Sequence, residues 1–492
     1  MSKKSVLSLD IGTSNLCGLA LSRDSLQPVA ICSEVNDTEI ANLPAGYHEQ
    51  DPLRIRDLCL GLIQKLLSEK KVRGNEVVGI GITGQMHGVL LVNSELEPQT
   101  NLITWRDQRT LASDKPGYIN KAVEALGPEI RQHTGCRLHA GYGGATLHWL
   151  SKNNKLPDGT VALTIADYMA GCLTGVIATE ATHAASWGIF NPQKSMWDAE
   201  VVDNLGIPQK MLPTVHSTAQ PLGTIQPALA KQLGLGNNVQ VCSPVGDNQA
   251  GIIGAAGFAD DAVVLNLGTG GQISIPQNEY KFVETLETRP MPFGLRQAQS
   301  SRGFILVGAS LCGGWAYTYL QKFIQATVKE FAAIEISDEE IYRRMNAIAA
   351  ETDEGASGIT VDTRFSGTRL DPNLRGSISD IGVDNLTIAN LSRGFVEGMV
   401  AELADMASAV RPGGSRQAAG VSRFIGITRI IASGNAVRRN PAVPDVIESI
   451  FGLPCYISTN REAAALGAAY SAAIGLGLVS KDDICPSLER RR

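Results

Sequence analysis

Two short stretches, one in each half of the chain, share the same order of residue types. Residues 7–14 and 264–270 both combine an apolar strand, a Gly-Thr pair and further small residues, and a second strand follows each. Glycine in such a turn lets phosphate oxygens approach the backbone, and neighbouring hydroxyls can donate hydrogen bonds. This weak internal repeat predicts two similar domains with facing phosphate hairpins, at residues 10–15 and 266–271.

The length and the alternation of elements fit this plan. A chain of 492 residues suits two or three domains of about 150 residues each. Apolar residues make up 43% of the chain, which is enough to build cores. Strands alternate with helical patterns from end to end, so we expect an α/β fold of two domains with a cleft between them.

Composition argues against several classes of protein. Lys and Arg number 43 against 49 Asp and Glu, and a net charge of −6 disfavours partners such as nucleic acid or an anionic membrane. The nine Cys are scattered without a C-x-x-C pair, so neither a disulfide framework nor a zinc site is expected, and a cytoplasmic location fits best. The sequence shows no signal peptide pattern and no run of 18 apolar residues.

The middle of the chain carries an acid beside a phosphate-like turn. Residues 246–251 have the sequence Gly-Asp-Asn-Gln-Ala-Gly, which places Asp247 on a tight glycine turn. An apolar run then leads into the small-residue turn at residues 266–271. We interpret Asp247 as the carboxylate that performs the chemistry, with flanking segments that bring it two substrates.

Two segments of the first half carry polar groups suited to a small ligand. Gln85 and His87 follow the strand at residues 77–82, and α/β sheets bind ligands at such strand ends. A surface loop with an isolated histidine is equally compatible with that pattern. In residues 104–109 a Trp lies beside two Arg and one Asp, which suits either sugar stacking or a structural ion-pair cluster.

The second half offers further strand-end turns. Residues 433–436, Ser-Gly-Asn-Ala, follow a strand, and their small side chains suit a nucleotide base or ribose. Residues 411–420 form a polar loop that we expect to be mobile. The helix expected at residues 461–476 is rich in Ala, and its small side chains allow tight packing against a neighbour. Residues 481–492 are expected to form a charged, frayed tail.

Taken in this order, the motifs resemble the FGGY family of carbohydrate kinases, part of the actin-like ATPase superfamily. The resemblance covers nearly the whole chain. Residues 10–13 and 266–269 match the two phosphate motifs of the family, residues 246–248 match the segment with its catalytic aspartate, and residues 433–436 stand at the adenosine motif. Two residues of the last segment depart from the family's usual Gly-Gly-Ala-like run, namely Ser433 and Asn435.

The resemblance implies two ribonuclease H-like domains with a catalytic cleft between them. Residues 1–252 would form the sugar-side domain, residues 253–480 the nucleotide-side domain and residues 481–492 the tail. Asp247 would be the general base, and Asp10 with Asp247 would hold Mg²⁺. The implied sugar-binding residues are Gln85, Met86, His87, Trp105, Asp107 and Asn248. The implied ATP-binding residues are Gly12, Thr13, Ser14, Gly268, Thr269, Gly308, Cys312, Gly434 and Asn435.

The same resemblance implies a class of substrate. Glycerol kinases carry an Arg-Glu pair where this chain has Gln-Met-His at residues 85–87, which is similar to the ketose kinases. Longer matches at residues 79–88, 143–149, 185–191 and 246–250 favour sedoheptulose over xylulose. The expected reaction is phosphorylation of a ketose by ATP, giving sedoheptulose 7-phosphate, with xylulose or ribulose as alternative acceptors. A homodimer is compatible with the sequence.

Two alternatives of other classes stay open on the motifs alone. An actin-like ATPase switch would share both phosphate hairpins but would need no sugar loop at residues 85–87. A catalytically inactive sugar-binding relative would share the sugar loop. The intact Asp10, Asp247 and both Gly-Thr turns argue against the inactive relative.

Overall fold

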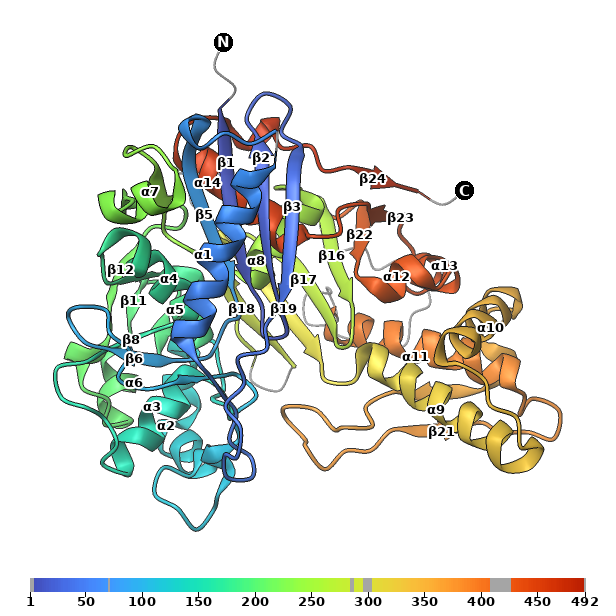
Figure 1. Ribbon diagram of the computed structural model, residues 1–492. Helices are drawn as coiled ribbons and strands as arrows, with labels where there is room; N and C mark the ends of the chain where they lie inside the picture. The colour runs from blue at the N-terminus through green and yellow to red at the C-terminus, as the bar shows by residue number, and fades with distance from the viewer. Residues whose placement is uncertain (1–3, 70, 284–286, 295–302, 408–425, 491–492) are drawn as a thin grey trace.

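The computed structural model describes residues 4–69, 71–283, 287–294, 303–407 and 426–490. It contains two mixed seven-stranded sheets, one in each half of the chain (Figure 1). The first sheet contains, in spatial order, β13 (Pro221–Thr224), β14 (Gln240–Cys242), β5 (Val77–Gly84), β1 (Ser5–Ile11), β2 (Asn15–Ser22) and β3 (Pro28–Val35), with β15 (Val245–Gly246) paired to β5. The second sheet contains β18 (Thr288–Pro292), β19 (Phe304–Ser310), β17 (Gly271–Gln277), β16 (Ala262–Leu267), β22 (Arg429–Ser433), β23 (Cys455–Ser458) and β24 (Leu488–Glu489).

The predicted repeat corresponds to two equivalent antiparallel hairpins. In the first, β1 pairs with β2 and is followed in the sheet by the parallel strand β5. In the second, β16 pairs with β17, and β22 lies parallel to β16 on its other side. The first turn requires glycine, because a Cβ on Gly12 would lie 2.7 Å from the carbonyl oxygen of Asn15. The expected α/β fold is therefore confirmed.

Helices cover both faces of the first sheet. On one face lie α1 (Pro52–Ser68) and α4 (Ile165–Thr174), and Asp51 caps α1 by accepting the backbone N–H groups of Leu53 and Arg54. On the other face lies α14 (Ala463–Gly475), where Ser8 donates a hydrogen bond to the carbonyl of Ala465 at 2.7 Å. A helix from the C-terminal part of the chain thus completes the core of the first sheet.

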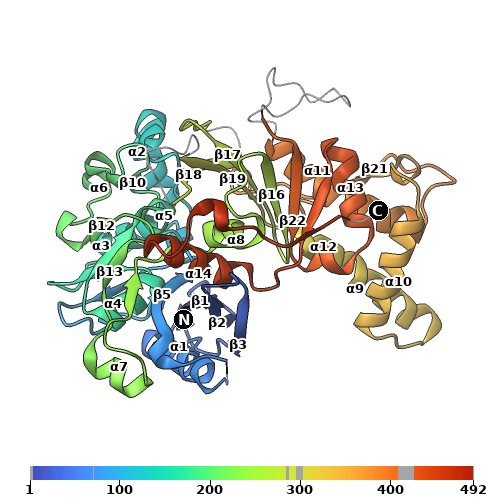
Figure 2. The same ribbon diagram turned by 90° about the horizontal axis from the view of Figure 1, so that it is seen from above.

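Two helices cross in the centre of the molecule with their backbones in contact. They are α8 (Asp247–Ala256) and α14, which Figure 2 shows between the two sheets. A Cβ on Gly254 would lie 1.8 Å from the carbonyl oxygen of Ala463, and a Cβ on Gly467 would lie 1.8 Å from that of Ala250. The expected domain boundary after residue 252 falls inside α8.

The remaining elements form an extension of each half. The first half adds β4 (Glu49–Gln50), β6 (Leu90–Val92), β7 (Leu102–Ile103), α2 (Ile119–Thr134), α3 (Gly143–Lys152), β8 (Val161–Leu163), β9 (Ala178–Glu180), α5 (Ala181–Ser186), β10 (Phe190–Asn191), β11 (Met196–Trp197), α6 (Ala199–Asn204), β12 (Thr214–His216) and α7 (Pro227–Leu233). The second half adds α9 (Gly313–Ala332), α10 (Asp338–Glu351), β20 (Thr360–Asp362), β21 (Ser377–Ser379), α11 (Ile388–Ala407), α12 (Asn435–Arg439) and α13 (Ala442–Phe451), and its helices α9, α10 and α11 lie on the right of Figure 1.

The end of the chain differs from the expectation. Residues 488–489 of the expected tail form β24, which pairs antiparallel with β23 at the edge of the second sheet. The loop expected at residues 411–420 lies outside the described residues. Among the helices that the structure describes, none has the length and apolar character needed to cross a membrane.

Candidate active site

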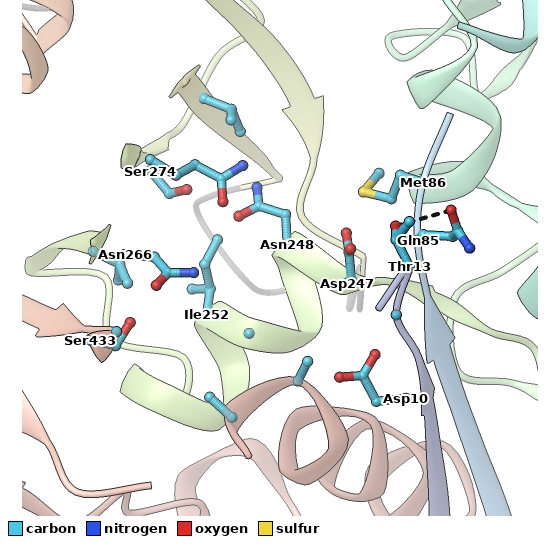
Figure 3. Close-up of a pocket in the computed structure, with 18 of the residues that line it drawn as sticks. Asp10, Thr13, Gln85, Met86, Asp247, Asn248, Ile252, Asn266, Ser274 and Ser433 are labelled. Carbon is cyan, nitrogen blue, oxygen red and sulfur yellow. Dashed lines mark hydrogen bonds between the residues drawn. The ribbon is translucent and has the colours of Figure 1, made fainter. Parts of the chain in front are cut away.

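A cavity of about 490 Å³ lies between the two halves, at the carboxyl ends of β1 and β5 and the start of α8 (Figure 3). Its walls come from both sheets, since residues of β16, β17 and β22 line it as well. It brings together ten of the residues expected to bind sugar, phosphate or metal, namely Asp10, Gly12, Thr13, Gln85, Met86, His87, Trp105, Asp247, Asn248 and Gly434.

A second cavity, of about 1020 Å³, lies in the second half of the molecule. It is lined by Gly268, Thr269 and Asn435, which were expected at the nucleotide, and by side chains from α9, α10 and α12. Gly434 lines the central cavity while its neighbour Asn435 lines the second one. The turn after β22 therefore stands between the two cavities.

Asp107 was expected at the sugar but lines neither cavity. Its carboxylate accepts hydrogen bonds from the Arg109 guanidinium at 2.8 and 2.9 Å, from the Arg109 N–H at 2.9 Å and from the His48 N–H at 2.8 Å. Arg109 also pairs with Glu49. Both oxygens are thus used inside a buried ion-pair cluster, and the structure supports the structural alternative for Asp107 and Arg109, whereas Trp105 lines the central cavity.

Three residues expected at the nucleotide also lie outside both cavities. Gly308 is buried in β19, where a Cβ would lie 2.8 Å from the sulfur of Met406. Cys312 is 1% exposed and belongs to the core of the second half. Ser14 is exposed on the first hairpin. Packing of the second sheet against α11 keeps Gly308 away from the cavities.

Asp247 is the first residue of α8 and follows the N-cap Gly246. Burial raises the pKa of Asp247 to about 6, and backbone N–H groups at the helix start oppose that rise. The preceding turn is held by a buried network that sequence reasoning missed. The Gly246 N–H donates to the Thr182 hydroxyl at 2.7 Å, and that hydroxyl donates to the carboxylate of Glu180.

Asp10 is the penultimate residue of β1 on the opposite wall, and Figure 3 shows its carboxylate near that of Asp247. Burial is the largest cause that raises the pKa of Asp10, and with the negative charges of Asp247 and Glu462 it raises that pKa to about 8. Such a concentration of carboxylates fits a hard cation. In the described part of the chain no group of three or more His, Cys, Asp or Glu is placed to enclose a metal. Mg²⁺ fits this pattern, because it is usually held by one or two carboxylates together with substrate phosphates.

A chain of hydrogen bonds joins the first hairpin to the sugar loop. The indole N–H of Trp105 donates to the Thr13 hydroxyl at 2.8 Å, which donates to the Gln85 amide oxygen at 3.2 Å. Gln85 donates onward to Gln50 at 2.9 Å, and Gln50 returns a bond to the Thr13 carbonyl. Gln50 had no local sequence signal. This network couples the expected phosphate turn to the expected sugar site.

Several contacts hold the His87 ring in place at one end of the central cavity. Its Nδ1 donates to the carbonyl of Ser186 at 2.7 Å, and its ring stacks on Tyr142 with centroids 4.4 Å apart. Burial and the charge of Arg289 hold the pKa of His87 well below its ordinary range, so the ring is neutral. Its Nε2 then accepts a hydrogen bond from Arg289 at 3.3 Å. Arg289 lines the cavity but was missed from the sequence.

Met86 supports the turn before Asp247 by packing. It is 5% exposed, and a Cβ on Gly246 would lie 2.7 Å from its terminal methyl carbon. Met86 also lines the cavity, so it contributes an apolar wall beside Asp247.

Comparisons with known proteins identify the family of this chain. The N-terminal domain model of the FGGY family of carbohydrate kinases matches residues 5–254, and the C-terminal domain model matches residues 263–476. The chain is similar to a sedoheptulokinase of Mus musculus, at 27% identity over 94% of this chain and 96% of that protein. It is similar to a xylulose kinase of Staphylococcus epidermidis, at 26% identity over 99% and 90%.

A solved gluconate kinase from Lactobacillus acidophilus has the same fold, with a TM-score of 0.83 and 23% identity over 99% of this chain and 93% of that one. This likeness confirms the expected actin-like fold of two domains. Because the two family models together span most of the sequence, the chain belongs to the FGGY family of carbohydrate kinases.

Proposed function

We propose that the protein transfers the γ-phosphoryl group of ATP to the terminal primary hydroxyl of a ketose, with sedoheptulose as the preferred acceptor and sedoheptulose 7-phosphate as the product. Sugar kinases of this family use ATP as co-substrate. The observation that carries the proposal is the placement of Asp247 at the start of α8, with a raised pKa, in a cavity lined by both halves.

In this proposal Asp247 accepts the proton of the sugar hydroxyl. Phosphoryl transfer depends mainly on alignment of the reactants and stabilisation of negative charge, so the protein needs little covalent chemistry. A general base of this kind typically contributes about 10²–10⁴-fold. Asn248, next to Asp247 in the cavity wall, and Trp105 would position the sugar.

The hairpin turns would bind the phosphates from both sides. Thr13 lines the central cavity and Thr269 the second one, so a nucleotide could extend from one cavity to the other past Gly434. Asp10, with Asp247, would hold Mg²⁺, which neutralises phosphate charge when bound. Closure of the halves on both substrates would exclude water as a competing acceptor.

The choice of sedoheptulose rests on the Gln-Met-His loop and the longer matching segments, and the similar mouse sedoheptulokinase supports it. Xylulose and ribulose are the alternatives, and a xylulose kinase is comparably similar. The deciding experiment is a panel of sedoheptulose, xylulose, ribulose and glycerol with coupled detection of ADP. We expect the highest kcat/KM for sedoheptulose, and a clear preference for another acceptor would overturn this choice.

An ATPase switch without a sugar substrate is the alternative of another class. Membership in a family of carbohydrate kinases favours the kinase. A switch would hydrolyse ATP at the same rate with and without ketoses. We expect ketose-dependent ADP formation, with stoichiometric sugar phosphate as the product.

His87→Ala is expected to raise KM for the ketose by about 10-fold, with a smaller effect on kcat. The substitution removes the ring that stacks on Tyr142 and releases Arg289 from the Nε2 atom, so the sugar end of the cavity loses its shape. Steady-state kinetics with each ketose would measure this change. His148→Ala is a matched control, because His148 is also buried and bonds a backbone carbonyl, that of Leu205, away from the cavity. An unchanged ketose profile in His87→Ala would remove His87 from the site.

The reaction is expected to slow in acid with a midpoint near the raised pKa of Asp247, which is about 6. A base must be deprotonated to accept a proton, so kcat/KM should fall about tenfold per pH unit below that pH. A pH–rate profile at constant ionic strength would measure this midpoint. An acidic limb near pH 4, the ordinary range of an aspartate at about 3.9, would contradict the assignment.

A further inference from the structure

The two-residue strand β15 leads directly into the turn that places Asp247 in the central cavity (Figure 3). Its parallel pairing with β5 brings Gly246 beside Gly84, but a strand of two residues forms few ladder bonds. Gly246, the N-cap of α8, has no side chain that could bond the free N–H groups of the helix. The position of this turn therefore depends on groups that reach it from other elements.

The Asp247 carboxylate takes its place from the backbone of the turn. The backbone N–H groups of Asp247 itself and of Asn248 donate hydrogen bonds to it. A displacement of the turn would therefore move the carboxylate relative to the sugar hydroxyl. Reacting groups tolerate little displacement, because a misplacement of about 1 Å can lower a rate by about 10².

One hydrogen bond holds this turn from a neighbouring helix. The N–H of Gly246 donates to the hydroxyl of Thr182, the second residue of α5, at 2.7 Å. Both residues are buried, so solvent cannot easily take the place of the hydroxyl. A buried N–H group without a partner is unfavourable, so the turn would shift if the hydroxyl were removed.

Glu180 sets the direction of the Thr182 hydroxyl. A hydroxyl has one proton to donate and lone pairs that accept, whereas an ionised carboxylate only accepts. Thr182 therefore gives its proton to Oε1 of Glu180 and turns a lone pair toward the N–H of Gly246. The donors then point in one direction along the whole chain of bonds, from Gly246 through Thr182 to Glu180.

Other donors fix the Glu180 carboxylate in place. Glu180 is fully buried at the end of β9, where it is the N-cap of α5. Its Oε1 also accepts the N–H of His183 at 2.9 Å, and its Oε2 accepts the hydroxyl of Thr218 at 2.6 Å. Burial raises the pKa of Glu180, and these hydrogen bonds oppose that rise. The surrounding donors thus favour the ionised carboxylate that the chain of bonds requires.

We propose that Glu180 is a positioning residue for phosphoryl transfer, and that it acts on Asp247 through the Thr182 hydroxyl and the Gly246 N–H. This role rests on the proposed function, because it concerns the same base. Neither Glu180 nor Thr182 lines the central cavity, so the effect reaches the substrates only through the turn. Loss of the chain should therefore lower kcat and leave KM nearly unchanged.

Thr182→Val keeps the shape of the side chain and removes the hydroxyl that Gly246 requires. We expect kcat to fall by about 10-fold, with KM for ATP and for the accepted ketose within about twofold of wild type. Thr182→Ser keeps the hydroxyl and should restore most of the activity. Steady-state kinetics would measure both variants, at a temperature where circular dichroism shows them folded. An unchanged kcat in Thr182→Val would overturn the proposal.

Thr179→Val is the matched control from the same segment. Thr179 lies in β9, is 2% exposed and donates to another buried carboxylate, that of Asp167, at 2.8 Å. The substitution removes the same kind of bond and leaves the chain from Gly246 to Glu180 intact. Its kcat should stay within about twofold of wild type. An equal loss of kcat in Thr179→Val and Thr182→Val would assign the effect to general loosening of this region and overturn the proposal.

Glu180→Gln tests whether Glu180 acts through Thr182. The amide keeps the size of the side chain but offers one acceptor oxygen in place of two, so kcat should again fall by about 10-fold. Two independent effects of this size would multiply to about 100-fold in the double variant. Action through Thr182 predicts instead that the double variant stays within about threefold of Thr182→Val alone. A multiplied loss would contradict that action.

Hydrogen exchange of the peptide that contains Gly246 separates this proposal from the proposed function. The measurement needs no substrate, and exchange should be faster in Thr182→Val and Glu180→Gln than in wild type or Thr179→Val. Unchanged exchange would overturn the proposal even if a ketose is phosphorylated as expected. Faster exchange together with the losses of kcat supports it for whichever acceptor the sugar panel identifies, so a different acceptor would overturn only the choice of ketose.

Discussion

Asp247→Ala is expected to lower kcat by at least about 10², while ATP binding stays nearly unchanged. The carboxylate begins α8 beside the cavity, where its raised pKa suits a base that works near neutral pH. The residues that line the second cavity, among them Thr269 and Asn435, are unchanged in this variant, so the affinity for the nucleotide should be nearly unchanged. Coupled ADP detection would measure turnover, and titration with a fluorescent ATP analogue would measure binding.

Two further variants sharpen this test. Asp247→Asn keeps the size of the side chain and removes its basicity together with its negative charge, so its loss of turnover should be of the same order as that of Asp247→Ala. Asp198→Ala is a matched control, because Asp198 also lies at a helix N-terminus, where it is the N-cap of α6, but lines neither cavity. Near-normal turnover in either Asp247 variant would exclude the residue as the base.

Gly467→Ala is expected to destabilise the protein by about 3 kcal/mol, the upper part of the range for overpacked cores. The added Cβ would lie 1.8 Å from the carbonyl oxygen of Ala250, a backbone atom that cannot move without shifting α8. A shift of α8 would also displace Asp247 at its start, so we expect activity to fall together with stability. Urea unfolding followed by circular dichroism would measure the free energy of unfolding.

Two glycines of α8, Gly251 and Gly254, provide a pair of substitutions that controls for the effect of the helix crossing. A Cβ on Gly251 would meet no atom within 4 Å, whereas one on Gly254 would lie 1.8 Å from the carbonyl oxygen of Ala463. In an open helical position, Gly→Ala usually stabilises by about 0.8–1 kcal/mol. We therefore expect Gly251→Ala to raise the stability and Gly254→Ala to lower it. Equal effects of both substitutions would contradict the close crossing of the helices.

The sequence predicted those parts of the fold that local patterns specify. An apolar run followed by Gly-Thr and a second strand is complete within about ten residues, so both hairpins could be found. The Ala-rich helix was expected to pack tightly, but its partners could not be named. Its bond with Ser8 joins residues 457 positions apart, and no local pattern carries such a contact.

The residues of the candidate site also fall into two groups, those that local sequence patterns predicted and those that they did not. Asp10 and Gln85 were predicted because they lie at strand ends, which meet at one edge of a sheet when the strands are parallel, and Asp247 was predicted because it lies on a glycine turn. Arg289 and Glu180 were missed, because their roles arise only from contacts made after folding. Local sequence patterns also could not show which groups a side chain forms hydrogen bonds with. Asp107 is the example, since its neighbour Arg109 occupies both of its oxygens.

The packing of α14 on the first sheet has a consequence for synthesis on the ribosome. The strands of that sheet and α8 emerge early, but roughly 200 residues separate α8 from α14, a delay of roughly 10–40 s at about 5–20 residues per second. During this interval the nascent chain exposes the apolar face that α14 later covers, including Val6, Leu19 and Leu21. The first half can therefore complete its core only after translation is nearly finished, and until then it offers chaperones a defined hydrophobic surface.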